Sequence, residues 1–277
     1  MMEKIKFLKM HGLGNDFIII ENENKINFKN DLVKNLCNRY EGIGGDLIVL
    51  LSKDSKNIAD FKADFFNSDG SSAEICGNAL RCVGKFFCKK LNKRNLLIET
   101  KTGLIDVEMI SKEKISVDLG MPKFLWNQIP IGRNLDTLNL DLNYGSLKGG
   151  AVVNIGNPHL IFFSKKIDKD EFIKYSKKIS TNQIFTEGIN ISVVDVVSKK
   201  EFLIYTFERG AGLTNACGTG ACASVAVARK LNLCDQKVMV NMTGGSLEVE
   251  ISNDDHILMI GNANEVFSGE FYIEKFI

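Results

Sequence analysis

Residues 211–232 read AGLTNACGTGACASVAVARKLN, and residues 73–92 read AEICGNALRCVGKFFCKKLN. In each stretch a cysteine followed by glycine leads into apolar residues at helical spacing, and each stretch ends in Lys-Leu-Asn. The residues after Cys217 are small and apolar on every side, which predicts a buried helix. We therefore expect Cys76 and Cys217 each to lie at the N-terminus of a helix in a hydrophobic core.

The two halves of the chain share further segments. Cys76 and Cys217 lie 141 positions apart, and Asn67 and Glu208 each precede their cysteine by nine residues. The other matching pairs are residues 14–17 and 156–159, 41–44 and 187–190, and 102–103 and 243–244. Because these matches keep the same order at a nearly constant offset, they predict an internal duplication of roughly half the chain.

Hydrophobic patterns predict alternating strands and helices in each half. The expected strands are residues 5–7, 17–21, 47–51 and 63–66 in the first half, and 151–154, 160–163, 191–197 and 201–207 in the second. A helix is expected over residues 31–39, with Asn30 or Asp31 as its N-cap, and another over 168–179. Prolines and glycines between residues 120 and 132 mark the crossover from one half to the other.

Composition excludes several classes of protein. The chain has 277 residues, of which 44% are hydrophobic and 25% charged, as in ordinary globular proteins. Its net charge of +1 gives no overall attraction to nucleic acid or anionic membranes, so we expect neither as a partner. The longest apolar runs, such as residues 47–51, are far shorter than the roughly 18 residues of a membrane-spanning helix. No signal-peptide pattern follows the basic residues near the N-terminus.

The seven cysteines favour a reducing compartment, because an odd number in a chain of this size does not form a disulfide framework. No C-x-x-C motif occurs, and the three histidines, His11, His159 and His256, are far apart in the sequence. We therefore expect no metal site. The most economical interpretation of Cys37, Cys82, Cys88, Cys222 and Cys234 is that they pack in the core.

Cys76 and Cys217 admit more than one interpretation. A helix N-terminus stabilises a thiolate and lowers a thiol pKa toward neutrality, which makes the thiol a usable base, and its free N–H groups bind carboxylates. Two such thiols on opposite sides of one substrate would invert a carbon acid without metal or pyridoxal phosphate. The alternatives are two packing cysteines, a dinucleotide fingerprint at residues 218–223, or a nucleophilic pair of Cys217 with His159.

The chain resembles the diaminopimelate epimerase family over essentially its whole length. The matching segments are residues 10–17, 66–70 with 76–78, 156–159, 208–210 and 216–221. The resemblance implies an α/β (α+β type) fold of two pseudo-symmetric domains, each with sheets wrapped around a central helix. It implies domains at residues 1–119 plus 265–277, which hold Cys76, and at 120–264, which hold Cys217.

The resemblance also implies a function. Members of the family convert LL-2,6-diaminoheptanedioate to the meso form, without a cofactor, in lysine and peptidoglycan-precursor synthesis. The enzyme would be a cytoplasmic, PLP-independent isomerase acting on a small amino acid, and a homodimer. By match, Cys76 and Cys217 are the catalytic acid–base pair, and His159 and Glu208 tune the thiols. The residues matching substrate-binding positions are Asn15, Asn67, Gly77, Asn78, Asn157, Asn190, Glu208, Arg209, Gly218 and Thr219.

The sequence departs from the family pattern at Leu47, which stands where many members carry a polar substrate contact. Ala79, Leu80 and Leu213 are also unusual, but none removes a catalytic group. Because Leu47 leaves the distal substrate contacts open, one alternative function is a cofactor-independent racemase of another amino acid. A second, from another class, is a non-catalytic carboxylate-binding or redox-sensing protein whose two thiols close to a disulfide.

Overall fold

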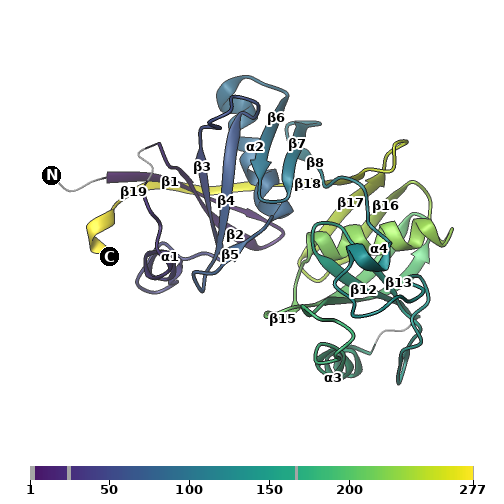
Figure 1. Ribbon diagram of the computed structural model, residues 1–277. Helices are drawn as coiled ribbons and strands as arrows, with labels where there is room; N and C mark the ends of the chain where they lie inside the picture. Colours follow the sequence, from purple (N-terminus) through teal and green to yellow (C-terminus); the bar gives the residue numbers. More distant parts are fainter. Residues whose placement is uncertain (1–3, 24–25, 166–167, 277) are drawn as a thin grey trace. The chain divides into compact units, whose positions relative to one another are not determined.

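The computed structural model describes residues 4–23, 26–165 and 168–276 (Figure 1). The chain divides into two compact units. The first comprises Met1–Val117 with Gly261–Ile277, and the second comprises Asp118–Ile260. Residues 1–3, 24–25, 166–167 and 277 of the two predicted domains lie outside the described residues.

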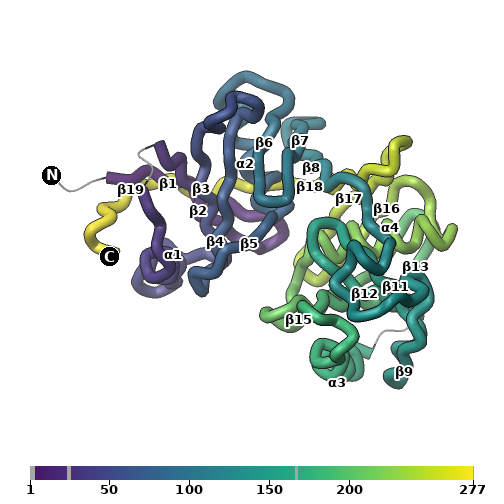
Figure 2. The backbone as a smooth tube through the Cα atoms, in the orientation of Figure 1, coloured from purple at the N-terminus to yellow at the C-terminus, as the bar shows by residue number. Residues whose placement is uncertain are grey.

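The first unit is a mostly antiparallel sheet with two helices. Its elements are β1 (Lys4–Gly12), β2 (Asn15–Glu21), α1 (Asn30–Cys37), β3 (Leu47–Ser52), β4 (Phe61–Asn67), β5 (Ser72–Ala73), α2 (Gly77–Leu91), β6 (Asn95–Thr100), β7 (Gly103–Met109), β8 (Lys114–Asp118), β19 (Asn264–Tyr272) and the 3₁₀ turn η2 (Ile273–Lys275). The last strand, β19, pairs antiparallel with β1, so the two ends of the chain run side by side in this unit (Figure 2).

The second unit repeats the plan. Its elements are η1 (Trp126–Gln128), β9 (Asn143–Tyr144), β10 (Leu147–Lys148), β11 (Ala151–Asn154), β12 (Pro158–Phe163), α3 (Lys169–Ile179), β13 (Asn190–Ser198), β14 (Glu201–Glu208), β15 (Gly212–Thr214), α4 (Gly218–Lys230), β16 (Lys237–Met242), β17 (Gly245–Ile251) and β18 (Ile257–Asn262). The short hairpin of β9 and β10 follows the crossover and has no counterpart among the described residues of the first unit.

Strand pairing supports the predicted duplication. In the first unit β1–β2 is antiparallel, β2–β3 parallel, β3–β4 and β4–β5 antiparallel, β4–β6 parallel, and β6–β7 and β7–β8 antiparallel. The series from β11 to β18 follows the same order and the same directions. Since each unit places its cysteine-bearing helix after the fifth strand of this series, the two sites arise from one topology.

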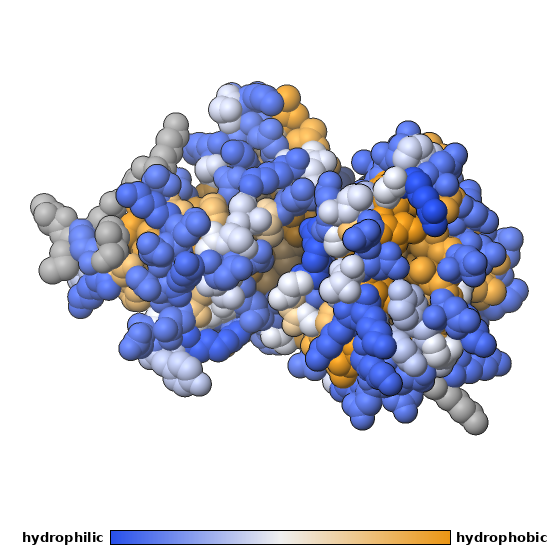
Figure 3. All heavy atoms as spheres, turned by 60° about the horizontal axis from the view of Figure 1, so that its bottom comes forward, coloured by the Kyte–Doolittle hydropathy of each residue, from blue (hydrophilic) through white to orange (hydrophobic). Residues whose placement is uncertain are grey.

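A helix occupies the core of each unit. Helix α2 packs against β1, β2, β6 and β7, and α4 packs against β11, β12, β13 and β17. Ten residues of each helix are buried, which confirms that the runs after Cys76 and Cys217 are core helices. Hydrophilic side chains cover most of the visible face of each unit (Figure 3). In the described part of the chain, no helix is long and apolar enough to cross a membrane.

The α/β class and the predicted strands and helices are confirmed, but both ends of the first helix were predicted wrongly: α1 ends at Cys37 and not at residue 39. Lys29, and not Asn30 or Asp31, is the N-cap of α1, and no side chain accepts a hydrogen bond from the first turn. Asp31 lies inside that turn, where its carboxylate is 3.8 Å from the Lys34 ammonium. Because α1 already begins at Asn30, both Asn30 and Asp31 lie inside the helix and neither is its N-cap.

Gly84 lets α2 approach β7 closely. A Cβ atom at this position would lie 2.4 Å from Val107 Cγ1 and 3.0 Å from Ile115 Cγ2, and both neighbours are fully buried. We expect Gly84→Ala to destabilise the first unit by about 1–2 kcal/mol, because overpacking exceeds the gain in helix propensity. Amide hydrogen exchange over residues 77–91 should accelerate. Fluorescence of Trp126, which lies in the second unit, should report unchanged stability there; unaltered exchange in α2 would contradict the expectation.

Candidate functional site

In the first unit the candidate residues gather at one end of three neighbouring strands. Asn15 begins β2, Leu47 begins β3 and Asn67 ends β4. The register pairs Leu47 with Phe17 on one side and with Asn67 on the other. Leu47 is buried, and the Asn67 side-chain amide donates to Ser71 Oγ at 3.0 Å. This strand end therefore presents two asparagines and a buried leucine.

Cys76 lies beside this strand end as the N-cap of α2. Its extended backbone (φ −137°, ψ 102°) lets its carbonyl accept the first helical hydrogen bond, from Leu80 N at 3.0 Å. Its Sγ lies 3.9 Å from Asn15 Oδ1, within hydrogen-bond range for a sulfur donor. The N–H groups of Gly77 and Asn78 open the helix, where no carbonyl of the helix itself can pair with them. The thiol is half-buried.

The second unit builds a corresponding strand end. His159 in β12 pairs with Asn190 at the start of β13, and both side chains are buried. The Asn190 amide donates to the Pro158 carbonyl and accepts from Arg209 N, both at 3.0 Å. The Arg209 guanidinium in turn donates to the Glu187 carbonyl. Asn190 thus holds the Glu208-Arg209 corner against the neighbouring strand.

Cys217 is the N-cap of α4, and its sulfur accepts a hydrogen bond from Gly220 N at 3.3 Å. Thr219 Oγ1 lies 3.5 Å from the same sulfur. Burial raises the pKa of the Cys217 thiol well above its usual value, and the negative charge of Glu208 adds to this effect. For Cys217, loss of water therefore outweighs the stabilisation that a helix N-terminus gives to a thiolate.

A chain of polar contacts joins His159 to the same helix terminus. His159 Nε2 lies 3.0 Å from Asn157 Oδ1, and Asn157 Nδ2 donates to Thr219 Oγ1 at 3.4 Å. Burial lowers the pKa of His159 to about 3, so its ring is neutral near pH 7. Because His159 contacts the Asn157 amide, the arrangement does not support a nucleophilic pair of His159 with Cys217.

Comparing the two strand ends explains the unusual leucine. In the first unit Leu47 pairs with Phe17, and in the second unit Asn190 pairs with His159. Leu47 therefore corresponds to Asn190, and Phe17 corresponds to His159. The β13–β14 register ends at the pair of Ile191 with Phe207, so that Asn190 lies opposite Glu208 one position further on. In the first unit Leu47 pairs with Asn67 in the same way. The first strand end therefore carries the neutral Asn67 where the second carries the charged Glu208. Leu47 replaces the amide that secures the corner in the second unit.

Several supporting residues were missed from the sequence. Thr214 donates to Glu208 Oε1 at 2.5 Å, and the buried hydroxyls of Ser192 and Thr206 lie 2.9 Å apart beneath the start of α4. A Cβ atom at Gly220 would lie 2.7 Å from Thr206 Oγ1, so the helix rests directly on this pair. Ser192 and Thr206 could have been found in the sequence, because each is a polar residue within a strand of mostly apolar residues.

Each unit thus offers a thiol, free helix N–H groups and uncharged hydrogen-bonding side chains at one helix terminus. Free N–H groups and the helix dipole can bind a carboxylate, and a correctly placed thiol can exchange a proton with the carbon next to that carboxylate. Within the described residues, no group of three or more His, Cys, Asp and Glu side chains is arranged to hold a metal ion.

Comparison with known sequences assigns the family. The family model described as "Diaminopimelate epimerase" matches residues 7–125 and 151–266. A diaminopimelate epimerase of Zymomonas mobilis is 40% identical over 265 residues, covering 95% of this chain and 96% of that protein. Another, of Carboxydothermus hydrogenoformans, is 40% identical over 277 residues, covering 97% of this chain and 100% of that protein.

Solved structures with low sequence identity share the fold. A hydroxyproline epimerase from Agrobacterium vitis has a TM-score of 0.69 at 12% identity, covering 96% of this chain and 92% of that one. A phenazine biosynthesis protein of the PhzF family from Bacillus anthracis has a TM-score of 0.67 at 16% identity, covering 98% and 99%. The sequence matches, extending over nearly the whole chain, show that it belongs to the diaminopimelate epimerase family.

Proposed function

We propose that this protein interconverts LL-2,6-diaminoheptanedioate and meso-2,6-diaminoheptanedioate without a cofactor, with Cys76 and Cys217 as the acid–base pair. One observation carries the proposal: the two cysteines are the N-caps of the core helices in two units that share the same series of strand pairings. They belong to a chain whose relatives are named for this epimerisation. The other five cysteines are buried and lie away from the helix N-termini.

The proposed step is a direct inversion at one α-carbon. A thiolate on one face takes the α-proton, leaving a carbanion whose charge spreads into the adjacent carboxylate. The thiol on the other face then gives its proton to the same carbon, so the two sulfurs exchange protonation states. The N–H groups of Gly77, Asn78, Gly218 and Thr219 would stabilise the growing carboxylate charge. The proposal requires both helix N-termini to reach this one carbon.

The remaining candidate residues are proposed to bind and position the substrate. Asn15, Asn67, Asn157, Asn190 and Arg209 supply amide and guanidinium groups suited to the ammonium and carboxylate groups of a diamino dicarboxylic acid. Glu208, through the charge that it places beside Cys217, and the neutral His159 would adjust the second thiol. Leu47 offers no hydrogen bond, so the contacts to the distal end of the substrate would come from the other residues.

Isotope exchange tests the function. In deuterated water, fully reduced protein should both deuterate the α-carbon and interconvert the LL and meso isomers, whereas other amino acids offered in parallel should react more slowly. Absence of both reactions with diaminopimelate would contradict the proposal. Faster inversion of another amino acid would instead assign a racemase of different specificity, for which Leu47 is the structural reason.

We also propose that the protein works as a homodimer in the cytoplasm. All seven cysteines are free thiols, as expected in a reducing compartment. The dimer rests on the family resemblance alone. Light scattering coupled to size-exclusion chromatography should give twice the 30.8 kDa mass of one chain.

A further inference from the structure

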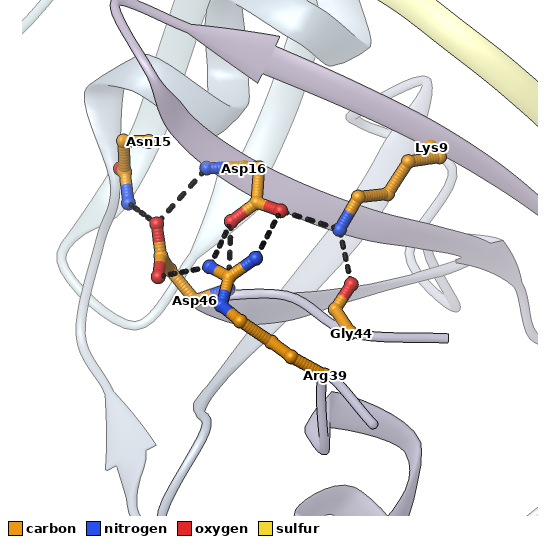
Figure 4. A network of polar contacts seen from close by, with 6 residues as sticks. All are labelled: Lys9, Asn15, Asp16, Arg39, Gly44 and Asp46. Atoms are coloured by element: carbon orange, nitrogen blue, oxygen red, sulfur yellow. Dashed lines mark hydrogen bonds and ion pairs between the residues drawn. The ribbon is translucent and has the colours of Figure 1, made fainter. Parts of the chain in front are cut away.

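A cluster of four charged side chains in the first unit lies next to Asn15 (Figure 4). The Asp16 carboxylate accepts hydrogen bonds from both terminal nitrogens of Arg39, at 2.7 and 3.0 Å, and lies 2.6 Å from the Lys9 ammonium. The same guanidinium reaches Asp46 Oδ1 at 2.8 Å. Two cations and two anions balance, so the cluster adds no net charge to the site. We call Lys9, Asp16, Arg39 and Asp46 the ionic cluster.

Burial and hydrogen bonds hold the ionic cluster in place. The Lys9 side chain is only 8% exposed, although lysine is among the residues least often buried, and its ammonium donates to the Gly44 carbonyl. A Cβ atom at Gly45 would lie 3.3 Å from the Lys9 ammonium. Burial disfavours the Asp16 carboxylate, but hydrogen bonds from Arg39 and Lys9 outweigh it and lower the Asp16 pKa. The Asp16 carboxylate is therefore ionised and held between Lys9 and Arg39.

The second oxygen of Asp46 holds the Asn15 side chain. Asp46 Oδ2 accepts from Asn15 Nδ2 at 3.0 Å and from the backbone N–H of Asp16 at 3.1 Å (Figure 4). Asn15 follows a two-residue turn in which Leu13 has φ +58°, a conformation that costs a non-glycine residue about 1–2 kcal/mol. The backbone of Asn15 is thereby fixed by the turn, and its carboxamide by Asp46.

This contact decides which end of the Asn15 amide faces Cys76. A carboxylate accepts hydrogen bonds and cannot donate them, so the Asn15 NH₂ group turns toward Asp46 and its carbonyl oxygen toward the Cys76 sulfur. We infer that Asp46 is a positioning residue: through Asn15 it presents a hydrogen-bond acceptor to the Cys76 thiol and fixes this side chain for substrate. The kinetic part of this inference rests on the proposed function, and the geometric part does not.

Thiol alkylation tests the geometric part without substrate. Cys76 is the only half-buried cysteine among the seven described, so iodoacetamide should modify it first, as peptide mass spectrometry would identify. In Asp46→Asn the remaining oxygen pairs with Arg39, and the new NH₂ group faces the Asn15 NH₂. The Asn15 amide should then turn over and donate to the Cys76 sulfur. Because a donor stabilises the thiolate, alkylation at fixed neutral pH should be about three- to tenfold faster.

Asp46→Ala provides the second variant, since it removes both acceptors and releases the Asn15 amide. It should also change the alkylation rate. Asp60→Asn is the matched control: Asp60 likewise pairs with a lysine, Lys93, and accepts a backbone N–H, from Leu97 at 2.9 Å. It should leave the alkylation rate unchanged. An unchanged rate in both Asp46 variants would overturn the inference whether or not the protein is an epimerase.

A double-mutant cycle tests the kinetic part. Asp46→Asn alone should lower kcat/KM for inversion about tenfold, whereas in an Asn15→Ala background it should have almost no further effect, because Asp46 acts through Asn15. Asp60→Asn should retain the wild-type kcat/KM. If the two substitutions multiply in the double variant, Asp46 acts independently of Asn15 and the inference is wrong. If wild-type protein shows no inversion, the proposed function fails, and the alkylation result still stands.

Discussion

Replacing Cys76 or Cys217 by alanine is expected to lower the rate of inversion of diaminopimelate by about 10³-fold, since each thiol would supply one of the two proton transfers. The loss should appear in kcat, with little change in the affinity for substrate, because the helix N–H groups that bind the carboxylate remain. Residual α-deuteration should be confined to one stereoisomer in each variant, because the remaining thiol serves only one face of the carbon.

Cys82→Ala and Cys222→Ala are the matched controls. Cys82 and Cys222 lie on the same two helices and are fully buried, and burial raises the pKa of Cys82 to about 12. Removing their sulfur costs core packing but no proton transfer, so both variants should invert the substrate at near wild-type rates. Near-normal inversion by Cys76→Ala or Cys217→Ala would rule out the two-thiol mechanism, whichever way the controls behave.

The two thiols differ in a way that the duplicated sequence only partly revealed. Cys217 is buried beside the Glu208 carboxylate, which favours the protonated thiol. At the corresponding place in the first unit stands Asn67, which carries no charge. In the ligand-free protein the surroundings of Cys217 thus favour its protonated form. Bound substrate would have to alter the surroundings of Cys217 before this thiol could act as the base in the reverse direction.

Local patterns were enough to predict most of the fold. Runs of mostly apolar residues identified β3 and β13, and the small residues after Cys217 identified α4 as a core helix, because an element that is buried on every side carries few polar residues. Sequence patterns did not predict the parallel pairing of β2 with β3 or of β12 with β13, since strand direction depends on how segments far apart in the chain pack.

The site was predictable only where residues repeat or match a motif. Cys76, Cys217, Asn15 and Asn157 stand in segments that recur between the two halves. The ionic cluster was not predicted, because its members come from β1, β2, the loop after α1 and the turn before β3, and no spacing in the sequence links them. The raised pKa of Cys217 was also missed, since burial depends on the whole unit and not on the helix terminus alone.

Acid is expected to destabilise the second unit through His159. Its pKa falls from 6.5 to about 3 on folding, because burial penalises the charged ring. The unfolded chain therefore binds a proton that the folded unit excludes, so the stabilisation is complete above pH 6.5 and is lost as the pH falls toward 3. The full loss is about 5 kcal/mol at 1.36 kcal/mol per pKa unit, and about 2 kcal/mol is gone near pH 5.

Urea unfolding followed by Trp126 fluorescence measures this effect in isolation, because Trp126 is the only tryptophan and lies in the second unit. His159→Gln keeps a polar side chain for Asn157 but takes up no proton, so its stability should fall less between neutral pH and pH 5.

His256 provides a control, because its pKa shifts in the opposite direction on folding. A hydrogen bond to Asp118 raises the His256 pKa, so its contribution is present below 6.5 and lost at higher pH. His256→Gln should therefore retain the acid-side loss. Equal pH dependence in wild type and His159→Gln would show that His159 is not the residue that excludes the proton.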